Sequence, residues 1–399
     1  MNRLFKDSSI YLIGQILANI PAFFLIPYLT RKLGADGYGV MSYYAAYLSL
    51  FIIFVGLCQD GAIARYYYFY GRRNLNNIVI VGYVYAFLVS LLIFLVAYFL
   101  NSPIFMVLSL ISFTQAMLSV QLALRQCQKE PLNYVYIQLL VCVLTFGITI
   151  YLLETNSDNL VFYRFLALFL ANFISVIVAY YFFRKKKFKI KITRAIFKSS
   201  LLYIFSFGLP LILHHLSLFM KGQFDRVFIY NIYEASDLGI YAAAFNIALI
   251  LNIFIVSVNK AVVPHYFEAL KQKKIDVKKV KKLSLLMLLC VPVGAFFALL
   301  VPQGLFAWFL GDGFLGVKHY TVLFIVGFCL VPSYLVLVNF LFYHAKNKII
   351  SYSSVISSVI YLLVLFVTAS VDLKLVPLSL ILSNLAIIPL LYYQVGKIK

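Results

Sequence analysis

The sequence predicts an all-α polytopic membrane protein with about twelve transmembrane helices in two lobes of six. Three observations support this class. Of 399 residues, 64% are hydrophobic and only 12% are charged, which is too few polar side chains to cover a water-soluble domain of this size. Long apolar segments recur along the whole chain, and basic residues gather between them in a regular pattern.

Each apolar segment is long enough to cross a hydrocarbon layer of ~30 Å as a helix. Helix is the expected form, because backbone groups that face lipid must be paired within their own segment. The predicted spans are 8–29, 40–59, 78–99, 103–123, 132–153, 161–183, 199–219, 238–258, 284–302, 319–340, 349–369 and 375–394.

The loop charges predict the orientation. If both termini are cytoplasmic, 27 of the 34 Lys and Arg lie on the cytoplasmic side and 7 lie outside, with 5 and 8 of the 13 acidic residues respectively. This asymmetry recurs in loop after loop, as the positive-inside rule requires. In this orientation Lys221, Asp225 and Arg226 fall in an outer loop after the seventh span, where a surface ion pair is expected.

The basic segment 184–198 separates six spans from six spans. We therefore predict an N-terminal lobe over 1–183, a cytoplasmic linker over 184–198 and a C-terminal lobe over 199–399. A weak internal repeat at an offset of 200 residues supports a parallel duplication: Ala35 and Gly39 match Ala235 and Gly239, with three further identities nearby.

Four segments carry a family resemblance: Leu25 to Tyr44, Gly56 to Tyr67, Phe224 to Ala248 and Asn259 to Phe267. They resemble Wzx-type O-antigen and polysaccharide flippases of the multidrug/oligosaccharidyl-lipid/polysaccharide (MOP) exporter superfamily. The resemblance implies a MATE-like pair of lobes around a cavity, in the bacterial inner membrane. It also implies outward movement of an undecaprenyl-diphosphate-linked oligosaccharide, with a polysaccharide polymerase and a chain-length regulator as possible partners besides the membrane lipids.

An anionic diphosphate head requires cations at the cytoplasmic mouth. Arg suits bidentate phosphate contacts, and Lys offers a compact charge. The repeat offset pairs Asp60 with Lys260 and Arg65 with His265, so we expect an Asp60–Lys260 contact to help close an inner gate. The alternative is a local pair of Asp60 with Arg65. The remaining candidates are Arg125 at the cytoplasmic mouth, and Asp225 and Arg226 at an outer gate.

Polar residues inside the spans are candidates for binding the glycan, because a polar side chain is costly when it faces lipid. Helix–helix hydrogen bonds explain such residues equally well. The preferred set is Gln15, Asn19, Asn246 and Asn252. His214 and His215 in the seventh span are candidates for proton coupling, since histidine titrates near neutral pH.

Competing functions are a multidrug or cation exporter of the same superfamily, a membrane enzyme such as a polysaccharide polymerase, and a channel or scramblase. An exporter of cations favours carboxylates within the spans, which are almost absent. An enzyme is not expected, because no paired carboxylates, P-loop, HExxH or GxSxG motif occurs. The five Cys form no CxxC pair, so no metal or cofactor is expected, and the basic residues are a topology signal rather than a nucleic-acid surface.

Overall fold

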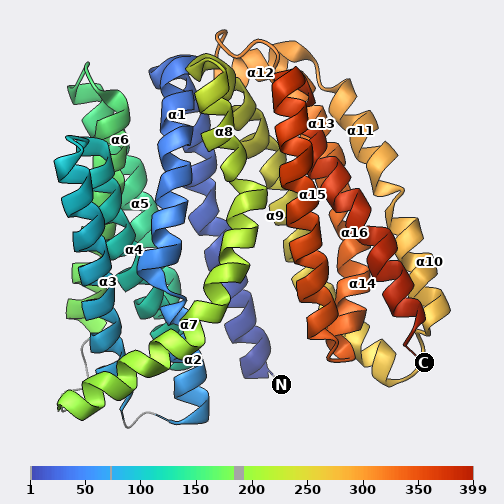
Figure 1. The fold of residues 1–399 in the computed structure, drawn as a ribbon, viewed down its shortest axis with the longest axis horizontal. Helices are drawn as coiled ribbons and strands as arrows, with labels where there is room; N and C mark the ends of the chain where they lie inside the picture. Colours follow the sequence, from blue (N-terminus) through green and yellow to red (C-terminus); the bar gives the residue numbers. More distant parts are fainter. Residues whose placement is uncertain (1, 72–73, 184–192, 399) are drawn as a thin grey trace. The chain divides into compact units, whose positions relative to one another are not determined.

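The structure is a computed structural model that describes residues 2–71, 74–183 and 193–398, apart from the side chains of residues 2–13, 15, 16, 18, 19, 22 and 347. The described residues form helices joined by short connections (Figure 1). Eleven helical stretches among them are long and apolar enough to cross a membrane. The predicted all-α membrane fold is confirmed.

The chain divides into two compact units. Unit 1 contains residues 1–33 and 43–216, and unit 2 contains 34–42 and 217–399, so α1 and α7 contribute to both. The helices that begin in unit 1 are α1 (Asn2–Gly56), α2 (Gln59–Phe69), α3 (Leu75–Phe99), α4 (Pro103–Cys127), α5 (Pro131–Thr155), α6 (Leu160–Phe183) and α7 (Arg194–Gly222). Most of the predicted linker, residues 184–192, lies outside the described residues, so the predicted domain limits stay a prediction.

Unit 2 contains the remaining helices, together with the middle of α1. Its helices are α8 (Phe224–Ile232), α9 (Ala235–Lys271), α10 (Val277–Met287), α11 (Cys290–Leu300), α12 (Gln303–Leu310), α13 (Val317–Cys329), α14 (Val331–Tyr343), α15 (Asn347–Val371), η1 (Leu373–Leu375) and α16 (Leu378–Gly396). Within the unit, α9 packs on α13, and α16 packs on α13, α14 and α15.

The first two predicted spans both lie in α1. Helical backbone continues through residues 30–39, where the sequence predicts a loop, and is interrupted only at Gly34 (φ 68°, ψ −178°). Glycine adopts a positive φ without the steric cost that a Cβ brings. With α1 counted as two spans, the prediction of twelve spans is confirmed. The loop predicted over residues 30–39 is wrong, because this segment is helical apart from a kink at Gly34.

Two predicted spans are each split into two shorter helices. The span 284–302 becomes α10 and α11, and Pro292 lies in the first turn of α11. The span 319–340 becomes α13 and α14, with Pro332 in the first turn of α14. Proline has no N–H to donate to the preceding turn, so each break falls within four residues before its proline.

Two glycines that match at the repeat offset pack against each other's helix. A Cβ on Gly39 would lie 1.8 Å from the carbonyl oxygen of Ala235, and a Cβ on Gly239 would lie 2.0 Å from that of Ala35. The contact is reciprocal, as expected for equivalent segments related by a local two-fold axis. It gives the weak sequence repeat a structural counterpart within unit 2.

We predict that Gly39→Ala and Gly239→Ala each destabilise the protein by ~1–3 kcal/mol, because a methyl group has no space against a backbone carbonyl. The measurement is the thermal midpoint of the detergent-solubilised protein. Gly147→Ala in α5 is the matched control, since a Cβ there meets no atom within 4 Å. Equal midpoints for all three variants would show that the close approach is not a packing constraint.

Candidate functional site

The seventh predicted span is longer than expected, and this changes the place of three charged residues. After α7 ends at Gly222, α8 continues to Ile232. The hydroxyl of Tyr233 donates to the carbonyl of Ala369 at 2.6 Å, and Lys221 Nζ donates to Ser357 Oγ at 2.8 Å. Both contacts have the same sequence separation of 136 residues, so the α7–α8 segment runs in register with α15.

This register places Lys221 level with the middle of α15. Tyr233 lies level with the end of α15, and Lys221 is twelve residues earlier, which corresponds to ~18 Å of helix. Its second acceptor, Asn384 Oδ1 at 2.7 Å, lies midway along the span Leu373–Gly396. The expected outer-loop position of Lys221 is therefore wrong. Its side chain joins α7 to the middle of two other spans.

Asp225 and Arg226 are also buried in unit 2 rather than lying on an outer surface. Asp225 is 2% exposed, and its Oδ2 accepts a hydrogen bond of 2.5 Å from the hydroxyl of Tyr241. Tyr361 of α15 lies near this carboxylate and interacts with it electrostatically. The predicted surface ion pair is wrong, because Asp225 and Arg226 are both buried and the Asp225 carboxylate accepts from Tyr241 of α9.

Arg226 is 4% exposed and is satisfied by local groups. Its Nη1 donates to the carbonyl of Gly222 at 3.0 Å and to the side chain of Gln223. The guanidinium lies 4.8 Å from the centre of the Phe245 ring, in a cation–π contact. The Asp225 carboxylate accepts the backbone N–H of Arg226 at 2.9 Å.

Arg125 forms the corresponding buried cation of unit 1. It is 8% exposed, and its guanidinium donates to Gln128 at 3.1 Å and to Gln121 at 3.4 Å. Glu130 Oε2 lies 3.5 Å away and supplies a counter-charge. Gln121 in turn donates to the hydroxyl of Tyr83 at 3.0 Å, so the network connects α4 to α3.

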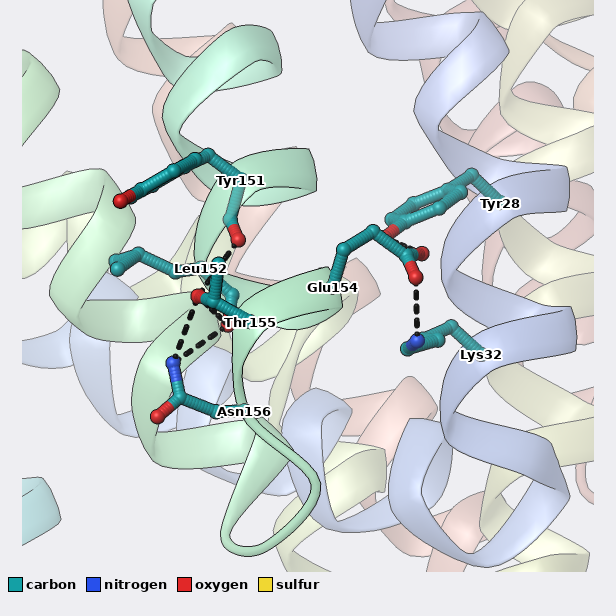
Figure 2. A network of polar contacts seen from close by, with 7 residues as sticks. All are labelled: Tyr28, Lys32, Tyr151, Leu152, Glu154, Thr155 and Asn156. Carbon is teal, nitrogen blue, oxygen red and sulfur yellow. Dashed lines mark hydrogen bonds and ion pairs between the residues drawn. The ribbon is translucent and has the colours of Figure 1, made fainter.

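The helices α1 and α5 are joined by a cluster that sequence reasoning missed (Figure 2). Glu154 of α5 accepts hydrogen bonds from the Tyr28 hydroxyl at 2.7 Å and from Lys32 Nζ at 2.9 Å. The side chains of Thr155 and Asn156 bond to the last carbonyls of α5, as Figure 2 shows, and close the helix beside Glu154. Because Lys32 and Glu154 are 122 residues apart, no local pattern signals the pair.

The α1 side of this cluster borders a hollow of about 430 Å³ in unit 1. It is lined by Phe24, Pro27, Tyr28, Arg31 and Lys32. Two basic side chains beside an aromatic and a proline ring can contact an anionic group that carries an apolar chain.

The predicted gate residues are distributed over both units. Asp60 and Arg65 are exposed on unit 1, and Lys260 and His265 are exposed on unit 2. The Arg65 guanidinium lies 5.8 Å from the ring of Phe69 and 5.9 Å from that of Phe207. The described ion pairs do not include Asp60 with Arg65, and the pairing of Asp60 with Lys260 stays a prediction.

Of the four predicted glycan-binding residues, the structure describes the side chains of the two in unit 2. Asn246 donates to the hydroxyl of Tyr38 at 2.8 Å, and Asn252 is partly buried. The side chains of Gln15 and Asn19 lie outside the described residues. A helix–helix hydrogen bond thus accounts for Asn246.

The predicted proton-coupling pair, His214 and His215, is exposed, and the two ring centres are 5.7 Å apart. In the part of the chain that the structure describes, no group of three or more His, Cys, Asp or Glu could hold a metal ion.

Solved structures share this fold at low sequence identity. The lipid II flippase MurJ in an inward closed conformation aligns with a TM-score of 0.73 and 12% identity, over 98% of this chain and 88% of that one. An inward-facing multidrug resistance MATE family transporter of the MOP superfamily aligns with a TM-score of 0.69 and 15% identity, over 96% and 94%. The fold is therefore MATE-like and MurJ-like.

Sequence comparison identifies the family within this class. Residues 4–270 match the model of the family described as "Polysaccharide biosynthesis protein", and the chain belongs to that family. Protein 1 of the Lsg locus of Haemophilus influenzae is 43% identical over 396 residues, which cover 99% of each chain. An uncharacterised membrane protein of the same organism is 43% identical over 98% of this chain and 96% of its own. The family predicted from the four motif segments is confirmed.

We predict that Tyr241→Phe destabilises the protein by ~1.5–3 kcal/mol, because the change removes a hydrogen bond to a buried carboxylate. Thermal unfolding of the purified variant measures the effect. Tyr352→Phe is the control, since Tyr352 is 72% exposed. If both variants unfold at the wild-type temperature, the Asp225–Tyr241 contact does not stabilise unit 2.

Proposed function

We propose that this protein moves a polyprenyl-diphosphate-linked oligosaccharide, an O-antigen or other surface polysaccharide repeat unit, from the cytoplasmic to the outer leaflet by alternating access. The observation that carries the proposal is the family match over residues 4–270 on a chain with a MOP-type transporter fold. A polysaccharide biosynthesis protein of this fold has a polar, lipid-anchored intermediate as its natural cargo. The proposed location is the bacterial inner membrane, with both termini cytoplasmic. The proposed partners are the lipid-linked glycan, membrane lipids, a polysaccharide polymerase and a chain-length regulator.

The charges of the chain support an anionic cargo. The sequence carries 34 Lys and Arg against 13 Asp and Glu, and the positive-inside pattern assigns most basic residues to the cytoplasmic side. Of the candidate residues, Arg65 and Lys260 are exposed at helix positions where a diphosphate can reach them. The buried carboxylate of Asp225 accepts a hydrogen bond from Tyr241 and is unsuited to binding a cationic drug.

We predict that loss of this protein leads to accumulation of undecaprenyl-diphosphate-linked repeat units on the cytoplasmic leaflet while surface polysaccharide disappears. Extraction of lipid-linked glycans and staining of surface polysaccharide measure the two effects, and the restored wild-type gene is the control. Unchanged glycan with altered drug sensitivity would instead favour a multidrug exporter, the second candidate, whose fold this chain also shares with a TM-score of 0.69.

We further propose that Asp60 and Lys260 form part of an inner gate and that the substrate diphosphate competes for Lys260. The repeat offset of 200 residues relates the two positions, and both side chains are exposed on their units. Opposite charges brought close together favour a closed gate, and a phosphate group can displace a carboxylate from lysine.

The gate predicts that Asp60→Lys and Lys260→Asp each reduce surface polysaccharide, because like charges then meet. The double variant, which restores opposite charges, should recover a substantial part of it. Surface polysaccharide in a strain that lacks the native gene is the measurement, and Lys374→Asp on the exposed surface of unit 2 is the control. A double variant that transports no better than either single variant would disprove the pairing.

A further inference from the structure

Lys221 is a half-buried cationic side chain of unit 2 whose described partners are neutral. Its Nζ donates to Ser357 Oγ at 2.8 Å and to Asn384 Oδ1 at 2.7 Å. Neither acceptor carries a charge, and the described ion pairs do not include Lys221. An ammonium removed from water without a counter-ion is costly, even where its hydrogen bonds are satisfied.

Both acceptors are fixed by other helices. Ser357 donates its hydroxyl hydrogen to the carbonyl of Ser383 at 3.0 Å, and the Asn384 amide nitrogen donates to the carbonyl of Gly327 at 3.0 Å. Each group therefore presents a lone pair, not a hydrogen, to Lys221. The site is built from α13, α15 and α16 around the side chain of α7.

The ionisable groups nearest to this site on the surrounding elements have partners other than Lys221. They are Asp225 and Arg226 on α8, Tyr241 on α9, Tyr361 on α15 and Cys329 on α13. Tyr241 bonds to Asp225, Tyr361 lies near the same carboxylate, and Arg226 lies over Phe245 and bonds to Gly222. Cys329 faces Gly294 of α11, and the segment of α16 that contains Asn384 has no titratable side chain before Tyr392.

The geometry accommodates both protonation states of the amine. The ammonium has three N–H donors, and the two described acceptors use two of them. A neutral amine still has two hydrogens for the same acceptors, so loss of one proton preserves the two contacts while removing a half-buried charge. Arginine at this position could not lose its proton.

We propose that Lys221 is a proton-binding site inside unit 2. On release, one N–H bond breaks, its electron pair stays on Nζ as the lone pair of the amine, and the proton passes to water. Because Lys221 joins α7 to α15 and α16, its charge acts on the packing of three helices. His214 and His215 are exposed, and their role in proton coupling stays a prediction. Coupling of the Lys221 proton to export rests on the proposed function, but proton binding itself does not.

The direct test is a titration of the full-length protein with isotopically labelled lysine in lipid nanodiscs. The Lys221 signal is assigned by its loss in Lys221→Arg, and in Lys221→Gln if the arginine variant does not fold. We expect the Nζ and Cε signals of Lys221 to change from those of an ammonium to those of an amine at a pH at which the exposed Lys374, assigned by Lys374→Arg, is still an ammonium. If the Lys221 signals remain those of an ammonium at every pH measured, the proposal is overturned.

A cellular experiment separates this proposal from the proposed function. Lys221→Arg keeps a permanent positive charge at this position, and Lys221→Gln removes it permanently. Both variants should therefore reduce surface polysaccharide at least tenfold. The control Lys374→Gln should match the wild type. Full export by both Lys221 variants would refute coupling. If Lys221 titrates but loss of the gene leaves surface glycan unchanged, the proton site stands and the flippase assignment fails. If instead Lys221 does not titrate but loss of the gene abolishes surface glycan, the flippase assignment stands and the proton site is rejected.

Discussion

The inability of hydrocarbon to solvate polar groups is the constraint on which the rest of this structure depends. Backbone groups meet it within each helix, but an ionisable side chain inside a bundle needs polar side chains as partners. Lys221 finds Ser357 of α15 and Asn384 of α16, and Asp225 finds Tyr241 of α9. Arg125 finds Gln121 on its own helix and Glu130 just after it, and Gln121 carries the contact on to Tyr83 of α3. These polar contacts thereby tie helices together.

Two such contacts involve the helices that contribute to both units. Lys221 lies near the end of α7, and Tyr28 and Lys32 lie in α1 just before its kink at Gly34. A hydrogen bond between transmembrane helices contributes only about 1 kcal/mol, so each tie can form and break without unfolding the unit. Such contacts suit a protein whose helices must repack during a transport cycle, because they specify an arrangement without making it permanent.

The sequence predicted the helical spans well, because hydropathy over twenty residues is a property of the segment alone. It failed where partners that are distant in the chain determine the position of a residue. Lys221 was assigned to a loop because a charged residue ends an apolar window, yet Ser357 and Asn384, which are 136 and 163 residues away, hold it inside the unit. The segment around Gly34 was predicted to be a loop, whereas the helical backbone is interrupted there only at Gly34, which has a positive φ. The repeat offset succeeded, since Gly39 and Gly239 do meet reciprocally.

Fold likeness alone cannot separate a flippase from a drug exporter, because both kinds of solved structure align with this chain at similar TM-scores. The placement of charge distinguishes them better. Among the exposed candidates Arg65 and Lys260 are positive and Asp60 is negative. The buried acid Asp225 accepts a hydrogen bond from Tyr241, so a cationic drug would meet no available carboxylate there. A diphosphate needs exposed cations that it can bind and release. A conformational cycle needs buried polar contacts between helices that can break and form again. Exposed cations and interior ties therefore serve separate tasks, and an anionic, lipid-linked cargo requires both.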